Sequence, residues 1–195
     1  KAMRNGIIIT VLFACLIGSS LLFYAGWELI IVGLLCVLFA FLYTTGPYPL
    51  SYNGWGDILV IVFFGFVPVG GTYYVQALTW TTDTTIASLI CGLLIDTLLV
   101  VNNYRDREAD ARSGKRTVIV RFGEKFGSYL YLMLGMTASL LCFWFLFEGH
   151  LYAALLPLLY LIPHFLTWKR MVRIHSGKKL NSILGETCLL YTSPS

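Results

Sequence analysis

Long apolar runs separated by short polar segments are the main pattern of this sequence. Each run is close to the ~20 mostly apolar residues that a helix needs to cross a bilayer. The runs are continuously apolar, without the alternation that a membrane-spanning β-strand requires. The pattern therefore predicts six transmembrane helices. They cover residues 6–24, 28–43, 57–74, 84–101, 129–147 and 151–168.

Proline and glycine mark two places where a helix is not expected to continue. The segment 44–57 contains two prolines and three glycines, which predicts an irregular turn. Its tyrosine and tryptophan side chains are suited to the membrane interface. In the third run, Pro68, Gly70 and Gly71 predict an interruption. These small residues are either helix-contact positions or room for a ligand, and both alternatives stay open.

Composition supports an all-α, polytopic membrane bundle and excludes an ordinary soluble domain. Hydrophobic residues make up 57% of the chain and charged residues only 12%, with a mean hydropathy of +0.75. The five cysteines are scattered without a C-x-x-C spacing, so neither a disulfide framework nor a zinc site is predicted. We see no tandem repeat or low-complexity linker, and we interpret the chain as one domain.

The basic residues predict the topology of the bundle. Lys1 and Arg4 precede the first run, seven basic residues lie between the fourth and fifth runs, and five follow the sixth. Counting crossings puts all 14 on one side of the membrane, and the positive-inside rule makes that side cytoplasmic. The net charge of +4 thus reflects membrane orientation and does not point to a nucleic-acid surface.

Polar residues are concentrated between the fourth and fifth runs, and three of them have a regular spacing. Asn102, Asp106 and Asp110 are spaced i, i+4 and i+8, so they share one face if the fourth helix continues beyond the membrane. Carboxylate and amide oxygens suit Mg²⁺, which binds through one or two carboxylates together with substrate phosphates. The spacing predicts half of a phosphate-bridging metal site.

Gly114, Lys115, Arg116 and Thr117 follow this motif. Lys115 and Arg116 are residue types that bind a diphosphate. The glycine and lysine do not form a Walker A loop, because the upstream glycine is missing and Arg116 stands in place of the Ser or Thr. The alternative is a solvated cytoplasmic loop that only sets the topology.

Two ionisable residues lie inside apolar runs. Asp96 is flanked by apolar residues and should face either a polar partner or a wet cavity, since a carboxylate at bilayer depth costs about 2.5–3.5 kcal/mol. His164 follows Pro163 in the sixth run, and we interpret it as structural.

With these motifs in view, the chain resembles the UbiA-type intramembrane prenyltransferases. The last of three matching blocks is similar to the second Asp-rich motif of that family. The first two favour the branch that acts on 1,4-dihydroxy-2-naphthoate in menaquinone synthesis. The blocks are Gly46-Pro47-Tyr48-Pro49-Leu50-Ser51-Tyr52-Asn53-Gly54, Gly70-Gly71-Thr72-Tyr73-Tyr74, and Asn102 to Asp110 with Gly114-Lys115-Arg116-Thr117.

The resemblance implies nine transmembrane helices around a cavity open to the cytoplasm, of which the six predicted here correspond to the third to eighth. It places a first Asp-rich motif upstream of Lys1 and a ninth helix after residues 180–187. The segment 188–195 looks foreign to the family. We therefore expect a partial prenyltransferase domain over 1–187, followed by a non-native tail.

The resemblance also implies an activity in the inner (plasma) membrane. A polyprenyl chain would pass from polyprenyl diphosphate to 1,4-dihydroxy-2-naphthoate, with loss of CO₂, to give demethylmenaquinone. Asp106 and Asp110 would be catalytic, with Asn102, Asp106 and Asp110 as Mg²⁺ ligands. Arg105, Lys115 and Arg116 would bind the diphosphate. Tyr73, Tyr74 and Asp96 are candidates for the cavity lining.

Three other functions were considered. A prenyltransferase acting on 4-hydroxybenzoate or on haem uses the same machinery and stays open. A non-enzymatic transporter with Asp96 as an ion-coupling residue also stays open, although we see no inverted repeat. A CDP-alcohol phosphotransferase would require D-G and A-R pairs upstream of its aspartates, and neither occurs at that spacing.

Overall fold

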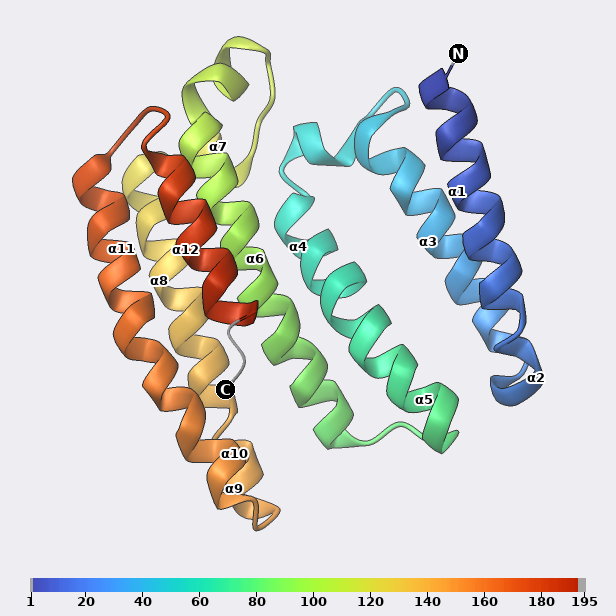
Figure 1. Cartoon of the computed structure of the whole chain (residues 1–195). Coiled ribbons are helices and arrows are strands. Elements are labelled where there is room, and N and C mark those ends of the chain that lie inside the picture. The colour runs from blue at the N-terminus through green and yellow to red at the C-terminus, as the bar shows by residue number, and fades with distance from the viewer. Residues whose placement is uncertain (1, 193–195) are drawn as a thin grey trace.

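The computed structural model describes residues 2–192, and within this part of the chain every regular element is a helix (Figure 1). Five helical stretches are long and apolar enough to cross a membrane, which confirms a polytopic all-α bundle. The second predicted span, 28–43, forms the helix α3 (Glu28–Thr44), which has 17 residues and is shorter than these five stretches. The five stretches are Met3–Ala25, Gly56–Ala77, Thr82–Arg112, Glu124–Phe147 and Leu151–Ile174.

The first half of the chain forms three hydrophobic passes. The first consists of α1 (Ala2–Ser19) and the short α2 (Leu22–Ala25), and α3 returns to the starting end. A 3₁₀ turn, η1 (Leu50–Asn53), lies in the proline-rich segment that was predicted to be irregular.

The third pass stays helical through Pro68, where the sequence predicted an interruption. It begins as α4 (Gly56–Val60), widens into a π-helix, η2 (Ile61–Gly70), and ends as α5 (Gly71–Ala77). Proline lacks an N–H and clashes with the carbonyl four residues before it. In a π-helix the backbone N–H groups bond to carbonyls five residues before them, so the carbonyl four residues before Pro68 need not lie against its ring. The helix therefore continues past the proline.

The longest helix, α6 (Thr82–Arg112), is the centre of the fold. Its start is capped by Thr81, whose Oγ1 accepts a hydrogen bond from the Thr84 N–H at 3.1 Å. Its 31 residues span about 46 Å, well beyond the ~30 Å hydrocarbon thickness of a bilayer. On one side it meets η2 closely: a methyl carbon built on Gly65 would lie 2.5 Å from the Ser88 carbonyl oxygen.

The second half of the chain packs on the other side of α6 (Figure 1). Its buried core includes Val100, Tyr104, Tyr131, Met171 and Ile183. The helices are α7 (Val118–Phe122), α8 (Glu124–Leu141), α9 (Trp144–Phe147), α10 (Leu151–Leu155), the 3₁₀ helix η3 (Leu156–Tyr160), α11 (Leu161–Ile174) and α12 (Leu180–Thr192). Because α12 continues to Thr192, the segment predicted to be foreign starts inside a helix.

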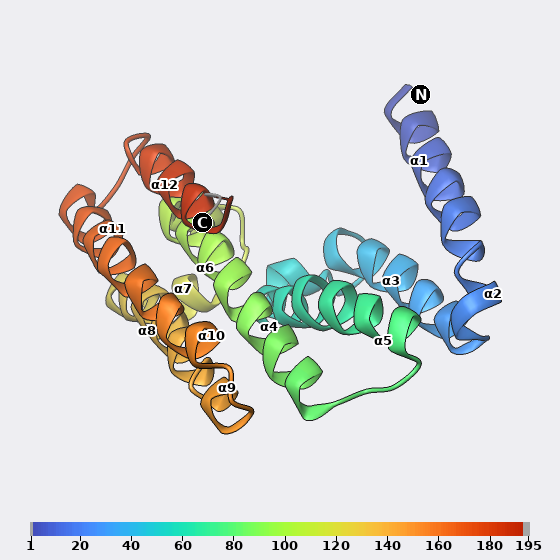
Figure 2. The same ribbon diagram turned by 60° about the horizontal axis from the view of Figure 1, so that its bottom comes forward.

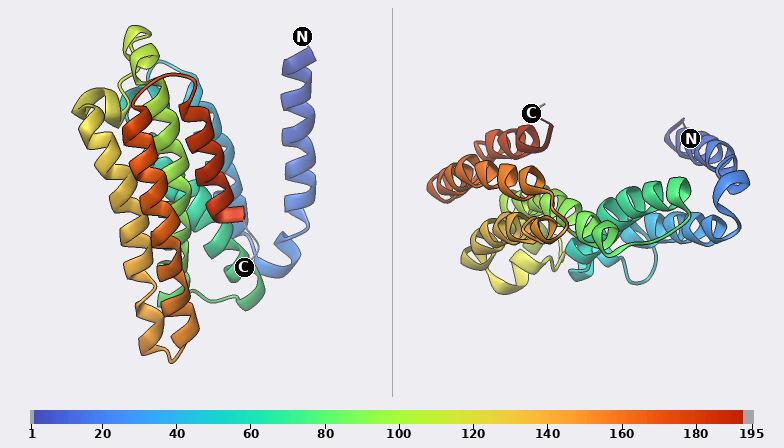
Figure 3. Two further views of the ribbon diagram at one scale, coloured as in Figure 1. Left: turned by 60° about the vertical axis from the view of Figure 1, so that its left-hand side comes forward. Right: turned by 90° about the horizontal axis from the view of Figure 1, so that it is seen from below.

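The helices form an open arc, with α1 and α12 at its two ends (Figure 2; Figure 3, right). The start of α1, the η1 loop, the end of α6 with α7, and the turn between α11 and α12 all lie at the same end of the bundle, at the top of Figure 1. Of the 14 basic residues, all but Lys1, which lies outside the described residues, are therefore at this end. We call it the motif end.

Candidate functional site

The predicted ligand triplet lies on the last three turns of α6, at the motif end. Because α6 continues as a helix to Arg112, Asn102, Asp106 and Asp110 follow one another along one side of it, as the i, i+4, i+8 spacing requires. This arrangement requires the helix to continue beyond the apolar run that ends at Val101, and α6 does so.

Arg105 joins the first two members of the triplet. Its Nη2 donates hydrogen bonds to Asn102 Oδ1 and Asp106 Oδ2, both at 2.6 Å, and its Nε donates to Asp106 Oδ1 at 2.8 Å. Its Nη1 reaches across to α12 and donates to Asn181 Oδ1 at 3.1 Å. The guanidinium thus places a positive charge against the same oxygens that the sequence assigns to a metal.

The third member, Asp110, is paired with Lys115. Lys115 Nζ lies 3.2 Å from Asp110 Oδ2, and both side chains are mostly buried. A tight turn brings them together: Gly114 has φ +79°, and the Lys115 N–H donates to the Asp110 carbonyl oxygen at 2.9 Å. The lysine predicted to bind diphosphate is therefore held beside the carboxylate predicted to bind the metal.

The triplet fits a hard cation that also takes oxygens from a ligand. Its donors are two carboxylates and one amide oxygen, and oxygen donors are what Mg²⁺ prefers. Across residues 2–192 no group of three or more His, Cys, Asp or Glu side chains could hold a metal without help. Mg²⁺ commonly binds through one or two carboxylates together with substrate phosphates, and half of such a site remains the prediction for this triplet.

A second loop is hydrogen-bonded to the Lys115 turn. The sequence predicted it as an irregular interfacial turn, and it contains the first of the three blocks that carry the resemblance. The Arg116 N–H donates to the Tyr52 carbonyl oxygen at 2.7 Å, and Arg121 Nη2 donates to the Asn53 carbonyl oxygen at 2.7 Å. Asn53 Nδ2 in turn donates to the Pro49 carbonyl oxygen at 2.8 Å. The proline-rich segment 44–56 thus holds the backbone that carries Lys115 and Arg116.

Gly54 offers a test of this tie. It has φ +82°, and a methyl carbon there would lie 3.0 Å from the Arg116 carbonyl oxygen. We expect Gly54→Ala to displace the Lys115 turn. If this turn binds a prenyl diphosphate, as the family resemblance implies, the KM for that substrate should rise about tenfold, which corresponds to ~1.4 kcal/mol.

Gly46→Ala is the matched control for Gly54→Ala. Gly46 has φ +97° in the same loop, but nothing lies within 4 Å of its added methyl carbon. It therefore carries the same backbone strain without the contact. Equal KM values in the two variants would mean that strain alone, and not the contact with Arg116, accounts for the effect.

Asp96 is buried, and a second carboxylate, Asp57, was missed in the sequence. Asp96 is 1% exposed and lies one turn after Gly92, whose face of α6 meets Ile61 of η2. Asp57 is in the first turn of α4. Within the described part of the chain, neither Asp57 Oδ1 nor Asp96 Oδ1 has a hydrogen-bond partner, although both atoms are buried.

Tyr73 and Tyr74 do not join the other predicted site residues. They lie in α5, at the opposite end of the bundle from the end of α6 (Figure 1), and the Tyr73 side chain is exposed. Their role as cavity residues remains a prediction.

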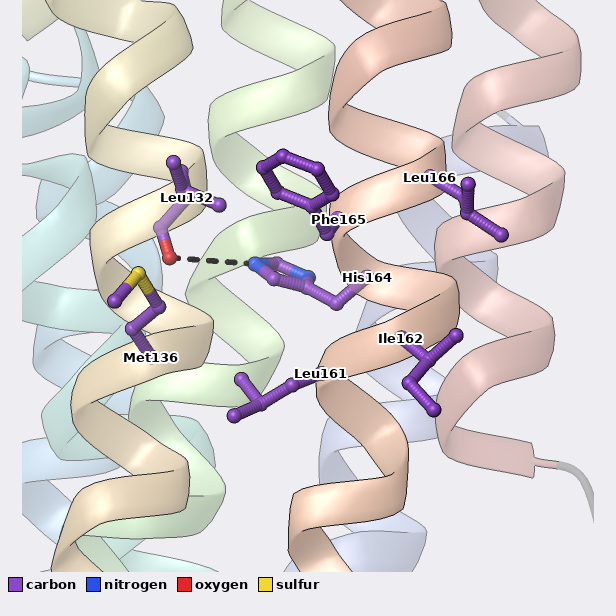
Figure 4. Close-up of a pocket in the computed structure, with 7 residues that line it drawn as sticks. All are labelled: Leu132, Met136, Leu161, Ile162, His164, Phe165 and Leu166. Atoms are coloured by element: carbon purple, nitrogen blue, oxygen red, sulfur yellow. Dashed lines mark hydrogen bonds between the residues drawn. The ribbon is translucent and has the colours of Figure 1, made fainter.

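His164 lies in the packing between α8 and α11, in keeping with the structural role predicted for it. It is fully buried, accepts or donates a 2.8 Å hydrogen bond with Tyr160 Oη through Nδ1, and stacks on the Tyr131 ring with centroids 4.6 Å apart. Its Nε2 lies 3.4 Å from the Leu132 carbonyl oxygen, beside an apolar cavity of about 480 Å³ (Figure 4).

Glu124, at the start of α8, connects the last turns of α6 to α8 by hydrogen bonds. Its carboxylate accepts hydrogen bonds from Tyr104 Oη at 2.9 Å and Arg107 Nη2 at 3.1 Å. It also bonds to His175, just after α11. No local sequence signal marks this cluster, because Glu124 is 17 or more residues away from each of its three partners.

Comparison with known proteins finds a prenyltransferase family and individual prenyltransferases that are similar to this chain. The model of the UbiA prenyltransferase family matches residues 2–184. The chain is 38% identical over 148 residues to 1,4-dihydroxy-2-naphthoate octaprenyltransferase of Escherichia coli, covering 73% of this chain and 48% of that protein. It is 43% identical over 119 residues to the Mycobacterium tuberculosis protein of the same name, covering 61% of this chain and 40% of the relative.

The chain spans about half the length, or less, of these curated relatives. No solved structure matches it. The family match nonetheless covers nearly all of the chain, including the three blocks that carry the resemblance and the whole α6 motif. This chain, a helical membrane bundle with the motif at the end of its central helix, therefore belongs to the UbiA prenyltransferase family.

Proposed function

We propose that the protein containing these residues transfers a polyprenyl chain from a polyprenyl diphosphate to 1,4-dihydroxy-2-naphthoate, with loss of CO₂, to give demethylmenaquinone in its reduced, hydroquinone form. The observation that carries the proposal is the α6 motif, in which Asn102, Asp106 and Asp110 lie beside two held cations, Arg105 and Lys115. The choice of acceptor rests on relatives named as 1,4-dihydroxy-2-naphthoate octaprenyltransferases.

The reaction breaks the bond between the allylic carbon and the diphosphate oxygen, and the bonding electrons leave with the diphosphate. Asn102, Asp106 and Asp110 would hold Mg²⁺ at this point, and the cation would supply positive charge against the charge that develops on the diphosphate. Lys115 and Arg116 lie on the adjacent turn, and Arg105 on the motif itself. These three side chains would bind the remaining diphosphate oxygens and orient the allylic carbon toward the acceptor.

The acceptor ring supplies the electrons for the new carbon–carbon bond. If the ring carbon that bears the carboxylate attacks, the carboxylate leaves as CO₂ and returns its electron pair to the ring, so that no other group is oxidised or reduced. The apolar helices around the site would exclude water from the allylic cation. The motif end would face the cytoplasm, across the plasma membrane from α5.

The proposal is tested with the full-length protein in detergent or liposomes, using octaprenyl diphosphate and 1,4-dihydroxy-2-naphthoate carrying ¹⁴C in its carboxyl group. We expect equal amounts of prenylated product and ¹⁴CO₂, with loss of both on EDTA treatment and recovery on adding Mg²⁺. Activity that persists at full rate in EDTA would contradict the metal assignment.

The same assay separates the alternatives. Transfer to 4-hydroxybenzoate but not to the naphthoate would assign another acceptor within the family. Solute uptake by liposomes, without consumption of prenyl diphosphate, would favour a transporter. The position of Asp96 between α6 and η2, with an oxygen that lacks a partner within residues 2–192, is the observation that keeps the transporter as a second candidate.

A further inference from the structure

An aromatic-lined cavity of about 540 Å³ lies between α3 and the helix formed by α4 and η2. Its rings include Phe39 and Phe63, whose centroids are 5.2 Å apart and whose planes are tilted by 41°. This volume falls in the ~300–1,000 Å³ range of small-molecule sites. The lining consists of Cys36, Phe39, Ala40, Tyr43, Leu59, Val60, Phe63 and Phe64.

Tyr43 connects this cavity to a polar pocket at the motif end. The residue lines both spaces, and its hydroxyl lies 3.6 Å from where a methyl carbon on Gly56 would be. The polar pocket also includes Asp57, Asn103 and Lys115. The phenol ring therefore borders the apolar cavity, while its hydroxyl points toward the first turn of α4.

The polar pocket contains a hydrogen-bond acceptor that lacks a donor. Asp57 Oδ1 is buried without a partner among residues 2–192, and so is Asp96 Oδ1 nearby on α6. Buried polar atoms are normally hydrogen-bonded, and an exception calls for a missing group. A ligand with an aromatic ring and a hydroxyl would supply that group, because the ring fits the apolar cavity and the hydroxyl donates to the carboxylate.

The polar pocket also adjoins the predicted metal and diphosphate site. Lys115 lines the pocket and is bonded to Asp110 of the motif. By contrast, the cavity beside His164 is bordered by a histidine that is already hydrogen-bonded (Figure 4). Of the two, only the Phe63 cavity shares a lining residue, Tyr43, with a pocket that contains an unpartnered buried acceptor and a direct neighbour of the motif.

We propose that the cavity between α3 and η2 is the binding site of the hydroxylated aromatic acceptor, with an acceptor hydroxyl donating a hydrogen bond to Asp57. This inference rests on the proposed function, which calls for such an acceptor. Asp57 is then a binding residue for the acceptor, and Tyr43 lies where the acceptor ring meets the polar pocket.

Cys36, which lines the cavity, provides a binding test that does not depend on turnover. The full-length protein is prepared with Cys36 as its only cysteine, and a second preparation keeps only Cys91, which lines a different apolar cavity. Both are labelled with methyl methanethiosulfonate at pH 9 with and without 1-hydroxy-2-naphthoate, a probe that keeps the ring and a hydroxyl. We expect the probe to slow labelling of Cys36 at least about fivefold and to leave Cys91 unchanged. Equal rates for Cys36 with and without probe overturn the proposal.

Steady-state kinetics provide the second test. Phe63→Leu and Asp57→Asn should each raise the KM for the acceptor about tenfold, with the KM for the prenyl diphosphate changed less than about twofold. Phe165→Leu, in the His164 cavity, and Asp83→Asn, whose carboxylate accepts a hydrogen bond from Trp144 at the other end of the bundle, are the matched controls.

The two tests separate failure of this inference from failure of the proposed function. Prenyl transfer to the naphthoate with an unprotected Cys36 and unchanged acceptor KM values would overturn the cavity assignment and leave the function intact. Protection of Cys36 by the probe, in a protein that does not prenylate the naphthoate, would support the cavity and contradict the function.

Discussion

Replacing Asp106 with Asn in the full-length protein is expected to lower the rate of prenyl transfer by about 1,000-fold. Asp106 is central in the triplet, and both of its oxygens are in contact with a positive group. Asparagine keeps the size of the side chain but removes the negative charge that would hold the cation at the breaking bond. Loss of one such electrostatic group typically costs a factor of about 10²–10³. Asp110→Asn should have a similar effect.

Glu108→Gln is the control for this experiment, because Glu108 lies on the same turn of α6 but is exposed. Its activity should stay within about twofold of the unaltered protein. The measurement is single-turnover transfer at saturating Mg²⁺, followed by a Mg²⁺ titration. Near-normal turnover in both the Asp106 and the Asp110 variant would overturn the metal assignment.

Gly65→Ala is expected to have the largest effect on stability. The added methyl carbon would lie 2.5 Å from the Ser88 carbonyl oxygen and 2.8 Å from the Gly92 Cα, and its nearest neighbours are all backbone atoms of α6. No flexible side chain can move aside, so α6 and η2 must separate. Overpacking of this kind typically costs about 1–3 kcal/mol. The midpoint of thermal unfolding in detergent should fall by several degrees.

Gly71→Ala controls for the general effect of replacing glycine in the same helical pass. Nothing lies within 4 Å of a methyl carbon at Gly71, so this change should leave the midpoint unchanged or raise it slightly, since alanine favours the helix. A midpoint for Gly65→Ala that matches that of Gly71→Ala would show that the close approach of α6 and η2 does not limit stability.

The sequence predicted the helices well because hydropathy decides where a backbone must satisfy its own hydrogen bonds. It could not predict how the helix passes Pro68, since π and α turns place the same apolar residues in the bilayer. The triplet was found because i, i+4 spacing is local. The ties from Arg116 to Tyr52 and from Arg121 to Asn53 were not, because they join residues more than 60 positions apart.

A sequence alone does not tell which distant residues lie close together, and this led to one omission and one inclusion in the candidate site. Asp57 was overlooked because a lone carboxylate at the start of a span is common, and only its packing beside Asp96 makes it unusual. Tyr73 and Tyr74 were included because their block resembles the family. Counting membrane crossings would have placed them at the end away from Asp106, where the structure has them.

If Mg²⁺ and a diphosphate bind at the α6 motif as we propose, Arg105 makes their affinities depend on each other. Its guanidinium binds the same oxygens of Asn102 and Asp106 that a cation would occupy. A cation that takes these oxygens would release the Arg105 guanidinium beside the proposed diphosphate site. A diphosphate that attracts Arg105 would free the oxygens for the cation. By thermodynamic linkage, each ligand raises the affinity of the other by the same factor. Arg105 thereby favours simultaneous binding of the pair over binding of either ligand alone.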